Sequence, residues 1–258
     1  MRRPVPRPAS AHSDVDPHPG PAVTPGSPDD DFTAVAEQRA RAARSLRCAD
    51  LVDALGRLHR HHSHILDLVT PTPGRVLFGP AATISYFPSC SAMMSPETYN
   101  FGALFRQATG ADADAARGKV LVLASNGYRD APAGGGTKLA RVAQYDLAGV
   151  LTDARLRDFD ELRTCPFAAY CSGAAVRWGG DVITPALANV PVVVAGVGVL
   201  PGQYVFADDS GAVVIPESDI DAVLAGAAAM REEDAGSRAR IARERRTGEA
   251  GAGGHRER

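Results

Sequence analysis

Apolar residues recur at helical spacing over the first well-patterned stretch of the chain, residues 32–58. Apolar positions three and four residues apart are typical of a helix with one buried face. The spacing breaks at residues 45–48, so the pattern predicts two short helices in place of one long helix. Residues 75–88 combine partial alternation with β-branched and aromatic residues, which predicts a strand or a hairpin.

Two apolar runs further along the chain are separated by a helical pattern. The runs lie in residues 118–127 and 148–158, and the stretch 137–147 between them follows a Gly-rich loop. Strand, helix and strand in this order form a βαβ unit, whose two strands are parallel and buried on both faces. Residues 189–217 then show short β runs punctuated by turn sequences, which is typical of a meander. Together these patterns predict a layered α/β domain with a central βαβ unit, as opposed to a doubly wound sheet.

The two ends of the chain differ from this central part. Residues 1–31 are rich in Pro, Gly, Ser and Asp and have little apolar surface to bury, so we expect a disordered tail there. Residues 231–258 begin with a charged helical pattern and end in a Gly-rich stretch, which predicts an exposed helix with a frayed end. The interval 32–230 remains, and its length favours one catalytic domain.

Composition narrows the class of protein. Hydrophobic residues make up 45% and charged residues 22% of the 258, the ordinary balance of a globular protein. No apolar run approaches the ~18 residues of a membrane helix and no secretion signal opens the chain, so we expect a cytoplasmic protein without a membrane partner. A net charge of −2 gives no basic field for nucleic acid. The four cysteines have no CxxC spacing, which argues against a zinc ribbon or a disulfide framework.

Two segments carry the strongest candidate chemistry, and each follows a strand of the βαβ unit. They are Gly134–Ala140, which opens a helix after a Gly-rich turn, and Asp153–Asp158. Ligands gather at the carboxyl ends of adjacent parallel strands, and a Gly-rich helix start presents N–H groups to an anion. Arg157 could clamp a carboxylate with two hydrogen bonds, and Asp158 could supply an oxygen ligand to Mg²⁺ or Mn²⁺. The alternative is structural: a tight turn, and an Arg157 that pairs with Asp158 or Asp160.

Several separated motifs resemble the RraA-like family, which contains the 4-hydroxy-4-methyl-2-oxoglutarate aldolases and the regulator of ribonuclease activity A. The resemblance covers most of residues 46–220. The matching pieces, in chain order, are ADLVDALGRL, VLFGPAATI, VLVLASNG, GGGTKLARVA, AGVLTDARLRD and NVPVVVAGVGVLPGQYVFADDSGAVVIP. The resemblance implies a single layered β/β/α domain of the swivelling type and a homo-oligomer, either a trimer or a hexamer, whose sites lie between subunits.

The resemblance also implies roles for individual residues. Arg157 falls on the arginine that holds the pyruvyl carboxylate, and Asp158 falls on the metal-ligating aspartate. The substrate-binding loop corresponds to five successive residues, Gly135, Gly136, Thr137, Lys138 and Leu139. The regulator does not keep the metal-ligating aspartate, so Asp158 favours the enzyme branch. Thr137 departs from the family pattern, which has an acidic residue there, and the loss removes a candidate proton acceptor.

These observations lead to one main hypothesis. It is a lyase that depends on Mg²⁺ or Mn²⁺ and cleaves a carbon–carbon bond of a 2-oxo acid, by aldol cleavage or decarboxylation, through a pyruvate-type enolate. Because Thr137 replaces the acid, decarboxylation or a tailoring step of specialised metabolism on a non-standard substrate is favoured. The alternative is a non-catalytic regulatory binding protein like the ribonuclease regulator.

Three smaller candidates remain. Lys138 could form a Schiff base if it lost its proton in a dry pocket. A cluster of His59, His61, His62 and His64 is more typical of a solvated patch than of a metal site. Cys171 has apolar neighbours, which more often make a thiol inert.

Overall fold

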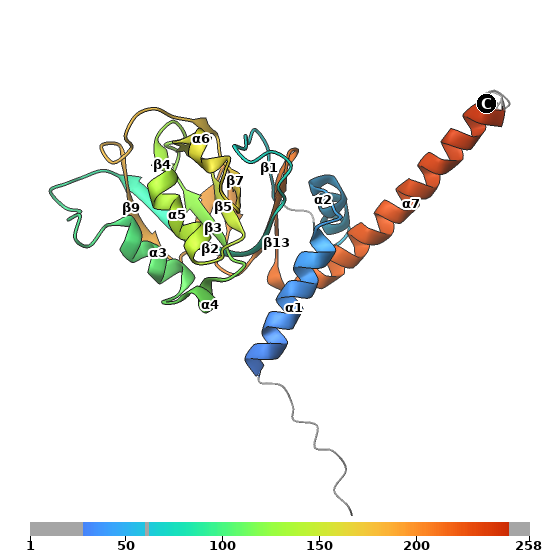
Figure 1. Ribbon diagram of the computed structural model, residues 1–258, viewed down its shortest axis with the longest axis horizontal. Helices are drawn as coiled ribbons and strands as arrows, with labels where there is room; N and C mark the ends of the chain where they lie inside the picture. Colours follow the sequence, from blue (N-terminus) through green and yellow to red (C-terminus); the bar gives the residue numbers. More distant parts are fainter. Residues whose placement is uncertain (1–27, 60–61, 248–258) are drawn as a thin grey trace, which may run out of the picture.

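The computed structural model describes residues 28–59 and 62–247 (Figure 1). The tail expected over residues 1–31 lies outside the described residues as far as residue 27, and the first helix begins at Pro28. The frayed end expected near the carboxyl terminus lies outside the described residues from residue 248 onwards.

The described chain begins with two helices, mixes strands and helices through its middle, and ends with a run of strands followed by a long helix. The helices are α1 Pro28–Ala43, α2 Cys48–Gly56, α3 Phe101–Thr109, α4 Ala113–Ala116, α5 Gly136–Gln144, α6 Phe159–Leu162 and α7 Ile220–Thr247, with a short 3₁₀ turn at Glu217–Asp219. The strands are β1 His64–Ile65, β2 Leu77–Pro88, β3 Val120–Ala124, β4 Pro132–Gly134, β5 Gly149–Thr152, β6 Arg155–Leu156, β7 Ala168–Tyr170, β8 Gly173–Ala174, β9 Ile183–Ala188, β10 Val192–Val194, β11 Val197–Val199, β12 Tyr204–Asp208 and β13 Gly211–Ile215. The predicted helix pair and the predicted strand at residues 75–88 are confirmed. The short strands predicted over residues 189–217 are present, but the meander is wrong, because β10–β11 and β12–β13 form two hairpins in different sheets.

A mixed eight-stranded sheet forms the centre of the fold. Its order is β1-β13-β12-β2-β3-β5-β7, with β9 also paired to β2. Strands β2, β3, β5 and β7 run parallel, and β3 and β5 are buried along their whole length. The βαβ unit is therefore confirmed as β3, α5 and β5. The long strand β2 joins this parallel half to the antiparallel β12–β13 pair.

Alternating residues of the buried strands face two different layers. Leu121 and Leu123 of β3 point toward helices α3, α5 and α6, and meet apolar residues such as Phe105 there. Val120 and Val122 point the other way, toward the β10–β11 hairpin. This period of two produces hairpin, sheet and helix layers, so the predicted β/β/α fold class is confirmed.

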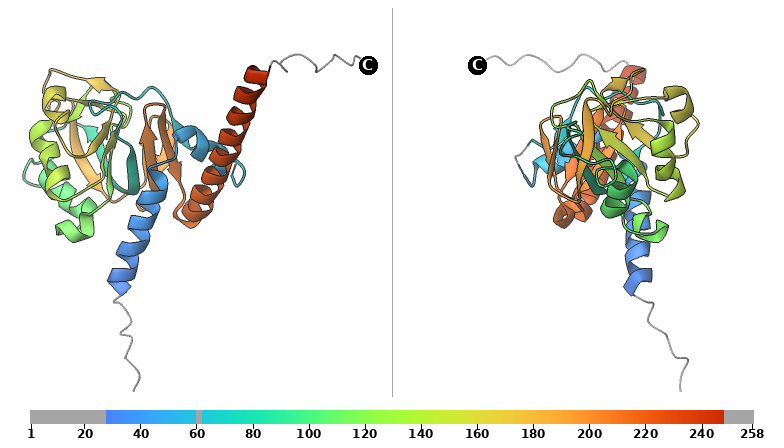
Figure 2. Two further views of the ribbon diagram at one scale, coloured as in Figure 1. Left: turned by 45° about the vertical axis from the view of Figure 1, so that its right-hand side comes forward. Right: turned by 90° about the vertical axis from the view of Figure 1, so that its left-hand side faces the viewer.

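A third apolar cluster lies at the β12–β13 end of the sheet. Leu51 and Leu55 of α2 pack there against Val213 of β13 and Val223 of α7, and all four side chains are buried. Helix α1 adds Arg39, whose guanidinium makes two hydrogen bonds to Asp221 on α7. Figure 2 shows α1, α2 and α7 together at this end, away from the other helices.

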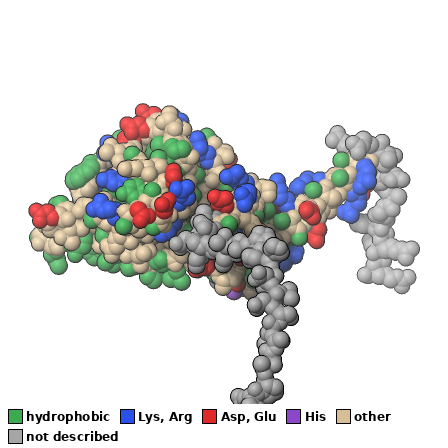
Figure 3. Space-filling view, turned by 60° about the horizontal axis from the view of Figure 1, so that its bottom comes forward, with side chains coloured by type: hydrophobic (Ala, Val, Ile, Leu, Met, Phe, Trp, Pro, Cys, Tyr) green, Lys and Arg blue, Asp and Glu red, His purple; other side chains and the backbone are tan. Residues whose placement is uncertain are grey.

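Most of α7 extends away from the body (Figures 1 and 2). Its 28 residues span about 42 Å at 1.5 Å per residue. The buried residues lie in its first part, and beyond Met230 the helix has mixed charges, visible as alternating blue and red side chains in Figure 3. Ion pairs such as Arg238–Asp234 support this exposed part. None of the helices in the described residues is long and apolar enough to cross a membrane.

A second, three-stranded parallel sheet carries the segments that the sequence singled out. Its order is β4-β6-β8, and Arg157 follows directly from β6. The sequence predicted that these segments follow directly after β3 and β5. The chain instead leaves β5 at Thr152, whose hydroxyl accepts a hydrogen bond from Ala154 N. It then forms β6 in the second sheet, so the candidate site lies one sheet further out than expected.

Candidate active site

The carboxyl ends of β4 and β6 bring the Gly-rich loop and Arg157 together. The backbone N–H of Arg157 donates to the carbonyl of Gly134 at 2.9 Å. This hydrogen bond continues the β4–β6 pairing by one residue, so Gly135 and Arg157 leave the sheet side by side. The sequence-predicted loop and the predicted Arg157–Asp158 pair therefore share one edge.

Asp158 closes this edge against the start of α5. Its Oδ2 accepts a hydrogen bond from Gly136 N at 3.0 Å. Its backbone lies in the left-handed region with φ of 60°, a conformation that Asp tolerates better than most residues. The side chain is 35% exposed, and Oδ1 makes no hydrogen bond within the part of the chain that the structure describes. Asp158 thus has one anchored oxygen and one free oxygen.

The Arg157 side chain has a buried nitrogen, Nε, that makes no hydrogen bond within the described residues. The closest carboxylate oxygen is Asp158 Oδ1 at 3.9 Å, which is too long for a hydrogen bond. A buried donor without a partner is costly, so Nε is available to an acceptor that enters the site. The expected structural Arg157–Asp158 pair is therefore loose.

Charged side chains lie in the space beside the two glycines at the loop. A Cβ on Gly135 would collide with Asp158 Oδ2, and it would crowd the Cβ of Arg157. A Cβ on Gly136 would overlap the carboxylate of Glu161, a residue of α6. Three charged side chains therefore converge on the loop at Gly135 and Gly136.

The other predicted loop residues have different environments. Leu139 is fully buried in the core, and Thr137 is exposed on the first turn of α5. Lys138 turns toward α3, where its ammonium lies 5.6 Å from the centre of the Phe101 ring. Burial lowers the pKa of Lys138, and the ring face stabilises its charged form. The contact that holds the Lys138 ammonium is therefore with Phe101, which lies outside the Gly135–Arg157 edge.

The donor set at this edge suits a hard divalent cation. Asp158 Oδ1 makes no hydrogen bond within the described residues, so this oxygen can act as a ligand. No three His, Cys, Asp or Glu side chains within residues 28–59 and 62–247 come together as a metal-binding group. Mg²⁺ commonly takes one or two carboxylates and keeps water or substrate oxygens as its other ligands. The residues present therefore fit Mg²⁺ or Mn²⁺ and do not fit a structural zinc site.

The smaller candidates from the sequence are not assembled into sites. His59 contacts Asp219 at 2.6 Å, and His62 packs edge-on against His64, while His61 lies outside the described residues. Cys171 is fully buried, and burial raises the pKa of its thiol to about 11. A thiol of this pKa is protonated at neutral pH and is not a nucleophile.

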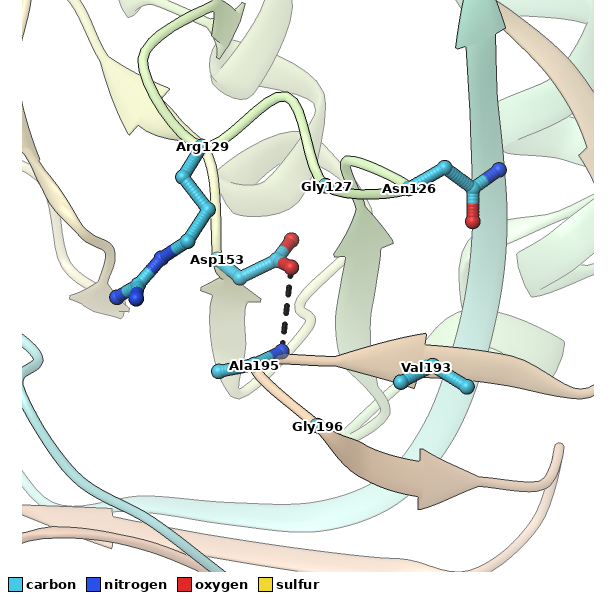
Figure 4. Close-up of a pocket in the computed structure, with 7 residues that line it drawn as sticks. All are labelled: Asn126, Gly127, Arg129, Asp153, Val193, Ala195 and Gly196. Atoms are coloured by element: carbon cyan, nitrogen blue, oxygen red, sulfur yellow. Dashed lines mark hydrogen bonds between the residues drawn. The ribbon is translucent and has the colours of Figure 1, made fainter.

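A cavity of about 480 Å³ lies elsewhere, at the ends of β3 and β5 (Figure 4). Its wall includes Asn126, Arg129 and the buried Asp153. The two carboxylate oxygens of Asp153 each accept a backbone hydrogen bond, from Ser125 N at 2.8 Å and from Ala195 N at 3.1 Å. Sequence reasoning missed both this cavity and Glu161. The buried strand end before Asp153 was a usable signal for the cavity, whereas no sequence pattern marked Glu161.

Comparisons with known proteins identify the family. The family model RraA-like, described as Aldolase/RraA, matches residues 48–214. Protein DlpA of Legionella pneumophila is 25% identical over 187 residues, which are 72% of this chain and 28% of DlpA. The 4-hydroxy-4-methyl-2-oxoglutarate aldolase of Thermus thermophilus is 37% identical over 107 residues, which are 39% of this chain and 60% of the aldolase. The chain therefore spans only part of the curated relatives that it matches.

Solved structures support the fold. RraAS2 of Streptomyces coelicolor, an unusual member of the RNase ES inhibitor RraA protein family, has a TM-score of 0.68 at 24% identity. The match covers 79% of this chain and 98% of RraAS2. An uncharacterized protein of Pseudomonas syringae gives a TM-score of 0.65 at 23% identity, covering 77% of this chain and 85% of that protein. At these identities the likeness concerns the fold alone.

Proposed function

Because the chain belongs to the RraA-like family, we propose that it is a carbon–carbon lyase that acts on a 2-oxo acid. The family includes 4-hydroxy-4-methyl-2-oxoglutarate aldolases and RraA regulators. The observation that carries the proposal is the free donor at Arg157 beside the free carboxylate oxygen of Asp158. A carboxylate and an adjacent keto oxygen are the groups that such a pair binds.

The described residues divide the task of binding. The Arg157 guanidinium receives the substrate carboxylate, and the buried Nε gains the acceptor that it lacks. Asp158 would hold a divalent ion through Oδ1, which the hydrogen bond from Gly136 N to Oδ2 orients. A bound Mg²⁺ or Mn²⁺ would supply Lewis-acid stabilisation of the enolate oxygen. The loop glycines leave room for the carboxylates of Asp158 and Glu161 beside the backbone.

Two reactions share this arrangement. In both, the bond between C3 and C4 of the 2-oxo acid breaks and its electron pair passes into a pyruvate-type enolate, which then takes a proton at C3. Decarboxylation releases carbon dioxide, whereas aldol cleavage releases an aldehyde or ketone and needs an acceptor for the C4 hydroxyl proton. The homo-oligomer, the cytoplasmic location and the division into tail, domain and terminal helix remain predictions.

The test is metal dependence of pyruvate release. The purified protein should release pyruvate from oxaloacetate or from a 4-hydroxy-2-oxo acid with Mg²⁺ or Mn²⁺, measured by coupling to lactate dehydrogenase. Excess EDTA should reduce the rate to that of the enzyme-free control, and added Mg²⁺ should restore it, because the site offers oxygen ligands. Absence of turnover with either ion would favour the regulatory alternative. Full activity in EDTA with borohydride trapping at Lys138 would favour the Schiff-base alternative.

A further inference from the structure

Glu161 is an unused carboxylate at the candidate active site. It lies in α6, three residues after Asp158, and residues at this spacing share one face of a helical turn. Its carboxylate makes no hydrogen bond or ion pair among the described residues. Two other nearby acids have partners, since Asp130 pairs with Arg155 and Asp158 accepts from Gly136.

The carboxylate of Glu161 lies in the space that a side chain at Gly136 would fill. Its Oε2 occupies the space in which any Cβ at residue 136 would lie, and its Cδ lies at 2.9 Å from that point. Gly136 also donates its N–H to Asp158, so Asp158 and Glu161 approach the same loop residue. A substrate held between Arg157 and Asp158 would therefore have Glu161 as its neighbour.

We propose that Glu161 accepts the C4 hydroxyl proton of a 4-hydroxy-2-oxo acid during aldol cleavage. This inference rests on the proposed function. The proton moves from the hydroxyl to Glu161, the C4–O bond becomes a carbonyl, and the C3–C4 electron pair passes into the enolate. The enolate then takes a proton at C3 to give pyruvate, and Glu161 returns its proton to solvent.

The proposal separates the two reactions of the site. Decarboxylation of oxaloacetate has no hydroxyl proton to remove, so it does not use Glu161. General-base catalysis contributes on the order of 10²- to 10⁴-fold. Glu161 should therefore determine aldol cleavage while it leaves decarboxylation almost unchanged.

The experiment compares both reactions in four proteins with Mg²⁺ present. In Glu161→Gln, kcat for aldol cleavage should fall about a hundredfold at nearly constant KM, and oxaloacetate decarboxylation should change less than threefold. Asp160→Asn, on the same short helix, is the matched control and should resemble the wild type. Thr137→Glu combined with Glu161→Gln places a carboxylate on the neighbouring turn of α5 and should recover part of the aldol rate.

Binding of oxalate, a stable analogue of the pyruvate enolate, supplies a readout other than activity. Calorimetry should give the same oxalate affinity in Glu161→Gln as in the wild type, because Glu161 does not hold the carboxylate. Equal losses in both reactions together with weaker oxalate binding would assign Glu161 to positioning and overturn the proposal. An unchanged aldol rate would also overturn it. If the wild type itself cleaves neither acid, the proposed function fails and this inference fails with it.

Discussion

Asp153 and Asp158 follow consecutive strands, β5 and β6, yet their carboxylates have opposite roles. Asp153 is 3% exposed, and both of its oxygens accept backbone N–H groups. Asp158 is 35% exposed, and only one of its oxygens has such a partner. The cavity beside Asp153 is the more obvious hollow, but its carboxylate is already satisfied.

The position of an aspartate at a strand end does not by itself make it a ligand. What matters is whether hydrogen-bonding capacity is left after the backbone has been satisfied. Asp153 joins the end of β3 to the turn of the β10–β11 hairpin, so it stabilises the contact between two layers. Asp158 has an oxygen without a hydrogen bond beside Arg157, whose Nε has no hydrogen-bond partner within the described residues.

The largest effect is expected on activity, from Asp158→Asn. The amide keeps the size of the side chain but loses the charge that holds a divalent ion, so pyruvate release should fall a hundredfold or more. Thermal unfolding and circular dichroism should remain close to those of the wild type. A variant that unfolds, or one that stays fully active, would contradict the assignment of Asp158 as a ligand.

The same substitution at the other position, Asp153→Asn, should act on stability. An amide has one oxygen where two are needed, and its NH₂ group would face a backbone N–H, so about 2 kcal/mol of unfolding free energy should be lost. Denaturant titration measures this loss. Activity per folded molecule should change less than threefold, and a large loss of activity without loss of stability would make the Asp153 cavity the better active-site candidate.

The smallest effect is expected at Ala195, which lies in the turn of the β10–β11 hairpin and has a left-handed backbone conformation. Its N–H donates to Asp153. The two-residue turn has φ of 48° at Ala195 and 87° at Gly196, which is the type I′ geometry that favours Asn or Gly. Ala195→Gly should therefore stabilise the protein by about 0.5 kcal/mol, since relief of left-handed strain exceeds the entropy that glycine adds to the unfolded chain. Calorimetry would detect the higher melting temperature, and a lower one would show that the alanine methyl group packs favourably.

The sequence was sufficient to predict the central βαβ unit and the first helices, because these elements have clear periods. The fully apolar run of β3 and the helical spacing before Leu58 each allow one interpretation. The sheet formed by β4, β6 and β8 could not be predicted, because strands of two or three residues have no period. The approach of Glu161 to Gly136 could not be predicted either, since it depends on how α6 turns back over the loop.

Within the candidate site, the placement of Arg157 and Asp158 was easier to predict from the sequence than that of the neighbouring loop residues. Backbone pairing between neighbouring strands brings this pair to the Gly-rich loop. Lys138, one turn into the helix, has a direction that depends on α3, a part of the chain far away in sequence. Thr137 indicated a missing acid, but only the folded chain reveals a carboxylate that approaches from α6.

The packing of α2 on β13 and α7 also determines when α2 can make its native contacts during synthesis. Leu51 and Leu55 leave the ribosome early, but their partners Val213 and Val223 are among the last core residues to follow. Until then the apolar face of α2 has no native neighbour, and closing so long a loop slows folding. A nascent chain interrupted before β13 would expose this face to chaperones and to other unfinished chains.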